Sequence, residues 1–91
     1  MEFDEEGRAA AASPGPVRSK AEALAAFPLL GFFRWGHLPP ALQAVSAPLS
    51  DVAWRMAATL PICPETTAGL RKLLEAKDCF VRAALPPDVR E

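Results

Sequence analysis

PETTAGLRKLLEAKDCFVRAAL, residues 64–85, is the stretch that decides the fold. Pro64 suits the first position of an α-helix, because the N–H that proline lacks would have no partner there. Leu85 is followed by two prolines, which cannot continue a helix. The stretch therefore predicts one long helix over residues 64–85. We expect three side chains to serve the free N–H groups of its first turn: Glu65, Thr66 and Thr67.

One face of this helix is apolar. Its large side chains recur at three- and four-residue steps, which is typical of a core-facing stripe: Leu70, Leu73, Leu74, Phe80, Val81 and Leu85. Lys77 falls inside this stripe, and two interpretations of it stay open. Either its stem packs and its ammonium extends to water, or it is a buried cation that pairs with a carboxylate or a ligand phosphate.

A second line on the same helix consists of small residues. Gly69, Ala76 and Ala83 are spaced by seven positions. Small side chains at this spacing let another backbone approach closely. We therefore expect a neighbouring helix along this line, from the same chain or from another subunit.

The N-terminal third begins with a predicted disordered tail, residues 1–18. Besides Met1, only Phe3 and Val17 in this tail are large and hydrophobic, which is too little burial to offset chain entropy. Ser19 and Glu22 then form a capping-box pattern, which predicts a short helix over residues 20–27.

An aromatic-rich connector, LLGFFRW, follows over residues 29–35. One interpretation is a lid packed over the open end of a helix pair. The alternative is a ligand site, in which aromatic rings stack on bases while Arg34 and His37 hold phosphates.

A second long helix is predicted over residues 40–60. Its large apolar side chains recur at three- and four-residue steps and form the expected core stripe: Leu42, Val45, Leu49, Val52, Met56 and Leu60. Pro48 predicts either a kink or a break, with Ser46 capping a new helix after the break. Trp54 lies off the stripe, so it contacts either another subunit or the N-terminal helix.

These elements predict an all-α fold with one small domain over residues 19–91. The turn between the two long helices is too short for anything but an antiparallel return. The predicted architecture is an antiparallel two-helix hairpin with a short preceding helix and a disordered N-terminal tail. A hairpin cannot cover both of its faces alone, so we expect a homo-oligomer.

Charge and composition exclude several classes of partner. The formal net charge is −1, so the chain lacks the concentrated basic surface that binding to DNA or RNA requires. The longest apolar run, residues 23–33, is too short to span a membrane, which takes about 20 residues. Cys63 and Cys79 lie too far apart on one helix to form a disulfide. The acidic N-terminus does not resemble a signal peptide, and we expect a reduced, cytoplasmic protein.

No pattern of catalytic or metal-binding residues occurs in the sequence. It has no Cys/His ligand spacing, glycine-rich phosphate loop, catalytic carboxylate pair or Ser/His/Asp set. We therefore expect no enzyme activity, no metal and no cofactor.

HLPPALQAVSAPLSDVAWRMAATLP, residues 37–61, together with the helix over 64–85 resembles small uncharacterised α-hairpin proteins of high-GC bacteria and their phages. More remotely, residues 35–85 resemble the hairpin of phage anti-CBASS sponge proteins, which sequester cyclic oligonucleotide messengers. The shared pattern is Leu-x-Lys-Leu-x-Glu-Ala, here Leu70, Lys72, Leu73, Glu75 and Ala76.

This second resemblance implies a homo-oligomer, such as a hexamer, that holds ligands between its subunits without turnover. Lys72 alone among the ligand candidates falls on the shared pattern. The other candidates are chosen by chemistry: Trp35 for stacking, Arg34, His37 and Lys77 for phosphates, and Thr66 or Thr67 for hydrogen bonds.

Two functions follow from the sequence. The first is a structural or protein-interaction hairpin that self-associates through Trp54 and the line of Gly69, Ala76 and Ala83. The second is a sponge for cyclic oligonucleotide second messengers.

Overall fold

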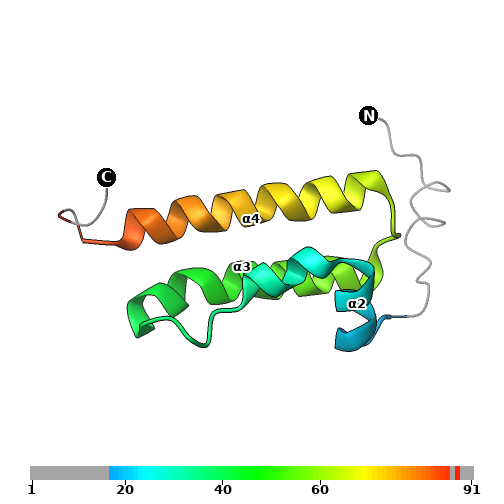
Figure 1. Cartoon of the computed structure of the whole chain (residues 1–91), viewed down its shortest axis with the longest axis horizontal. Helices are drawn as coiled ribbons and strands as arrows, with labels where there is room; N and C mark the ends of the chain where they lie inside the picture. The colour runs from blue at the N-terminus through cyan, green and yellow to red at the C-terminus, as the bar shows by residue number, and fades with distance from the viewer. Residues whose placement is uncertain (1–16, 87, 89–91) are drawn as a thin grey trace, which may run out of the picture.

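A computed structural model describes residues 17–86 and 88 of the chain (Figure 1). Its elements in chain order are helix α2, a 3₁₀-helix η1 and two long helices α3 and α4: Lys20–Ala26, Pro28–Phe33, Pro40–Thr59 and Pro64–Ala84. The two long helices lie side by side and run in opposite directions (Figure 1). The predicted all-α hairpin with a short preceding helix is confirmed.

The start of α2 follows from two local hydrogen bonds. The Glu22 N–H donates to Oγ of Ser19 at 3.1 Å, and the Ser19 N–H donates to Oε1 of Glu22 at 2.8 Å. This is the predicted capping box, which satisfies two N–H groups that the helix itself leaves free. The helix ends at Ala26 rather than at residue 27, because Pro28 begins the next element.

The aromatic connector forms the centre of the core. Phe27, Leu30 and Phe33 are the largest fully buried side chains among the described residues. Their spacing of three matches the three residues per turn of a 3₁₀-helix, so all three side chains lie on one side. η1 packs against α2, α3 and α4. The connector therefore packs against all three helices, and together with Phe27 it supplies the largest side chains of the core.

Helix α3 differs from its prediction in two ways. It is continuous through Pro48, so the predicted break at Ser46 is wrong. The predicted core stripe is also wrong, because Val52 and Met56 are 43% and 39% exposed. The buried residues of α3 are instead small: Ser46, Ser50, Ala53 and Ala57. Small side chains let the 3₁₀-helix and its large side chains come close to the α3 backbone. The free energy gained by this packing exceeds what burying the predicted stripe of larger α3 residues would give.

Helix α4 buries the first half of its predicted stripe. Leu70 is buried, and Leu73 and Leu74 pack half-buried against the core. Phe80 does not belong to the core, because it is 54% exposed. No helix in the described part of the chain is long and apolar enough to cross a membrane.

Arg18, which we placed in the tail, is held at the C-terminal end of α3. Its guanidinium donates to the carbonyls of Ala57 and Leu60 at 3.0 and 2.6 Å, and its N–H donates to the Ala58 carbonyl at 2.9 Å. The last carbonyls of a helix have no partner within the helix and attract a cation. The ordered chain therefore begins earlier than predicted, while residues 1–16 lie outside the described residues.

Candidate functional site

The segment between η1 and α3, residues 34–38, is held in a turn against the start of α3. The Leu38 N–H donates to the Trp35 carbonyl at 3.0 Å. The side-chain amide of Gln43, in the first turns of α3, donates to the carbonyls of Gly36 and Leu38 at 3.2 and 2.6 Å. These bonds give the segment a defined position, and with it the side chains of Arg34 and Trp35.

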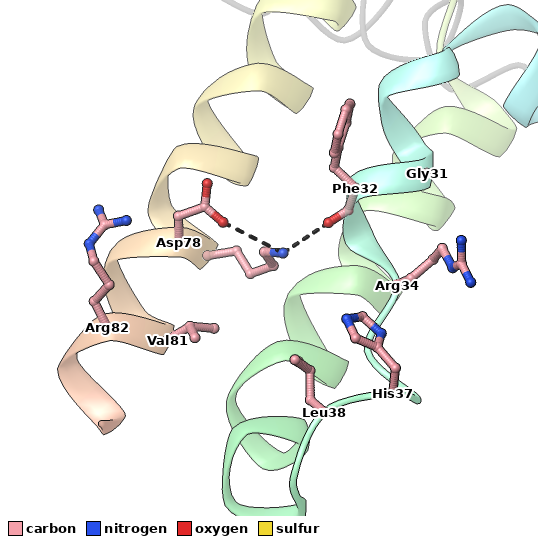
Figure 2. Close-up of a pocket in the computed structure, with 9 residues that line it drawn as sticks. Gly31, Phe32, Arg34, His37, Leu38, Asp78, Val81 and Arg82 are labelled. Atoms are coloured by element: carbon pink, nitrogen blue, oxygen red, sulfur yellow. Dashed lines mark hydrogen bonds and ion pairs between the residues drawn. The ribbon is translucent and has the colours of Figure 1, made fainter. Parts of the chain in front are cut away.

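This segment separates two depressions in the surface, and Arg34 and His37 border both. The first, which we call the lysine pocket, has a volume of about 590 Å³ and lies between the segment and the C-terminal half of α4. The second, which we call the tryptophan cleft, has a volume of about 650 Å³ and lies between α2, the segment and α3. Figure 2 shows the lysine pocket, in which the guanidinium groups of Arg34 and Arg82 point away from its centre.

Lys77 is buried in the wall of the lysine pocket. Its ammonium donates to the Phe32 carbonyl at 2.9 Å and lies 3.6 Å from Oδ1 of Asp78, as the dashed lines in Figure 2 mark. The Phe32 carbonyl belongs to the last turn of η1, where a helix offers no N–H partner. Nζ also lies 5.9 Å from the centre of the Phe33 ring. Of the two interpretations, the buried cation is the one observed, and a backbone carbonyl is its nearest partner.

The predicted ligand residues fall into two groups. Four of them lie around the segment 34–38: Arg34, Trp35, His37 and Lys77. The other three do not lie there: Thr66, Thr67 and Lys72. Both threonines are in the first turn of α4, more than two helical turns from Lys77. Within the described part of the chain, Arg34 and His37 form no hydrogen bond or ion pair.

Sequence reasoning missed two polar residues that border the tryptophan cleft, Lys20 and Ser50, and it predicted Trp54 for packing rather than for this cleft. Lys20 Nζ lies 5.5 Å from the centre of the Trp54 ring, which is a cation–π contact. For Trp54 this bears out the alternative of contact with the N-terminal helix. The signal for Ser50 was the second stripe of α3, small residues at three- and four-residue steps, which the larger stripe hid.

A separate apolar groove lies between α3 and α4. The residues that line it are all apolar: Ala44, Val45, Pro48, Leu49, Phe80, Ala83 and Ala84. Val52 and Met56 continue the α3 side of this surface by helical periodicity. We call this surface, with Val52 and Met56, the apolar face. Of the small-residue line of α4, Ala83 lines this groove.

Cys63 stands at the N-terminus of α4 with Thr66 one turn away. Oγ1 of Thr66 lies 3.4 Å from Sγ of Cys63, so the threonine pairs with the thiol rather than capping the helix as predicted. The hydroxyl of Thr66 and then its backbone N–H stabilise the thiolate, which lowers the pKa of Cys63. Among the described residues, no group of His, Cys, Asp and Glu side chains could hold a metal ion.

Replacing Lys77 with methionine tests the role of its hydrogen bond. We expect Lys77→Met to lower the free energy of unfolding by about 1 kcal/mol, because it removes the part-buried hydrogen bond to the Phe32 carbonyl. Urea denaturation followed by circular dichroism measures the change. Lys72→Met, on the exposed side of the same helix, is the matched control and should change stability little. A stabilised Lys77→Met variant would show that the lysine is merely tolerated in the core.

Replacing Thr66 with valine tests the origin of the Cys63 pKa. The substitution keeps the side-chain shape but removes the hydroxyl that stabilises the thiolate, so the pH midpoint of Cys63 alkylation should move upward. The measurement is the rate of iodoacetamide alkylation against pH in a Cys79→Ser background. An unchanged midpoint would mean that the hydroxyl does not act on the thiol.

No family model matches the chain, and no curated protein or solved structure is significantly similar to it. Its function is therefore inferred from the contacts and surfaces described above.

Proposed function

We propose that this chain is a cytoplasmic, non-enzymatic α-hairpin that acts as a structural or protein-interaction module and self-associates through its apolar face. The observation that supports this proposal is the inverted burial of α3. Its small residues are inside, while Val52 and Met56, two of its large apolar residues, are substantially exposed.

The apolar face has the chemistry of a buried interface. No charged side chain lines its groove, and depletion of charge is what distinguishes the centre of an interface from other surface. Phe80, more than half exposed, projects beside the groove. Aromatic side chains of this kind act as anchors at interfaces, because they bury a large area.

The small-residue line of α4 leaves room for the close approach of a second helix. Nothing lies within 4 Å of the position that a Cβ on Gly69 would occupy. Ala76 and Ala83 continue this line at spacings of seven. A helix from a second copy can therefore approach the α4 backbone closely. In this proposed arrangement, Phe80 of each copy lies beside the small-residue line of its partner.

The size of the core gives the energetic reason for self-association. Three of the seven buried hydrophobic residues among the described residues are alanines, which bury little area. Each Å² of apolar surface removed from water contributes about 25 cal/mol. Covering the apolar face with a second copy adds burial that the single copy lacks.

Replacing Phe80 with glutamate tests this function. We expect the wild-type chain to self-associate at tens of micromolar and Phe80→Glu to be monomeric, because a charge would have to be buried in an apolar interface. Multi-angle light scattering after size exclusion measures the mass. Phe32→Glu is the matched control, since Phe32 is 69% exposed and borders the lysine pocket instead. A wild-type chain that stays monomeric at this concentration would refute the proposal.

A second candidate function is sequestration of cyclic oligonucleotide messengers between subunits, as in the phage anti-CBASS sponges. One observation favours it. Arg34, Trp35 and His37 belong to one surface segment, and Lys77, from the distant helix α4, lines the same pocket as Arg34 and His37. Stacking and cationic side chains together are the chemistry that such ligands require.

A thermal-shift assay with cyclic di- and trinucleotides tests the second candidate. A ligand that binds the folded state raises its stability by about 2.7 kcal/mol at 100 times Kd, so the melting temperature should rise with concentration. The corresponding linear dinucleotides serve as the control for ring closure. No shift at millimolar ligand would exclude sequestration.

A further inference from the structure

We infer that the tryptophan cleft is a binding site for a planar aromatic molecule that carries a phosphate, such as a nucleoside monophosphate. Its volume of about 650 Å³ lies within the range of small-molecule sites, about 300–1,000 Å³. The inference takes its class of ligand from the second candidate function. It needs one subunit alone, and neither self-association nor a cyclic ligand.

Aromatic side chains form the apolar part of the cleft. Trp35, Trp54 and Phe33 line it. Phe33 is fully buried, whereas Trp35 is 37% exposed and presents ring surface to solvent. A flat heterocycle stacks on such a ring regardless of its substituents. Trp35 is therefore the platform for the aromatic part of the ligand.

Positive charge at the cleft is in excess over negative charge. Lys20 and Arg34 border it together with His37, and the acidic residue at the cleft is Asp51. Asp51 already pairs with Arg55 at 3.0 Å. Arg34 and His37 form no ion pair within residues 17–86 and 88. In a chain with a net charge of −1, this local surplus of cationic groups fits a phosphate.

Ser50 supplies a hydrogen-bonding group at the cleft. It is 4% exposed and lines the cleft, and its hydroxyl has no hydrogen-bond partner in the described part of the chain. The buried side-chain oxygen without a partner among the described residues is Oγ of Ser46, so the Ser50 hydroxyl keeps access to the cleft. A polar edge of a bound ring can therefore form a hydrogen bond with Ser50.

The lysine pocket on the other side of the segment is less suited to this ligand. Its central cation, Lys77, already binds the Phe32 carbonyl and lies beside Asp78. The guanidinium of Arg34 points away from that pocket (Figure 2). The unpaired cation of the segment is therefore free to serve the tryptophan cleft.

Tryptophan fluorescence measures binding directly, because both tryptophans of the chain line the cleft. AMP titrated into the wild-type chain should give saturable quenching, with N-acetyltryptophanamide correcting for absorbance. Adenosine lacks the phosphate and ribose 5-phosphate lacks the ring, so each should bind at least about tenfold more weakly. No saturation by AMP at millimolar concentration, or equal affinity for adenosine, would overturn the inference.

Variants then locate the site. Arg34→Ala should weaken AMP binding about tenfold, and Ser50→Ala should weaken it several-fold. Arg71→Ala, on the exposed side of α4, is the matched control and should leave affinity unchanged. Equal affinity of Arg34→Ala and wild type would place the ligand elsewhere. Monomeric Phe80→Glu should still bind AMP. A melting-temperature shift with cyclic oligonucleotides but no quenching by AMP would overturn this site and leave the second candidate function standing.

Discussion

The hydrogen bond between the Lys77 ammonium and the Phe32 carbonyl is the constraint on which the rest of this structure depends. It joins residues 45 positions apart in the chain, at 2.9 Å, and ties the end of η1 to the middle of α4. A buried lysine normally costs free energy. Here it satisfies a carbonyl that a 3₁₀-helix leaves free at its end. The same contact keeps Phe33 beneath the lysine and the connector pressed against both long helices.

Once η1 is fixed in this position, the packing of α3 follows. Phe27, which precedes η1, and Leu30 and Phe33 within it place three bulky side chains in the core. The facing side of α3 must then be small, and Ser46, Ala53 and Ala57 provide the space. The large apolar residues of α3 are displaced toward the groove with α4 and toward solvent. The apolar face is thus a direct consequence of a core built from a connector, and self-association is the most direct way to bury it.

The two candidate activities occupy different parts of the molecule. The apolar face lies between α3 and α4, whereas the tryptophan cleft lies between α2, residues 34–38 and α3. The cleft exists because Gln43 holds the carbonyls of Gly36 and Leu38 against the start of α3. Without this clamp, Arg34 and Trp35 would have no defined position relative to Trp54. The proposed self-association and the proposed ligand site therefore use separate surfaces.

The sequence by itself determined the features that depend on neighbouring residues. The capping box at Ser19, the prolines that begin α3 and α4, and the short return between them act within a few residues, so the all-α hairpin was predictable. The tertiary structure alone decided which face of α3 is buried, what Lys77 contacts and which ligand candidates meet. Two stripes of α3 have the same period, and only the bulk of Phe27, Leu30 and Phe33 selects the smaller one. Likewise, the partner of Lys77 is a backbone carbonyl 45 residues away. A pattern of side chains in the sequence cannot predict a contact with a distant backbone group.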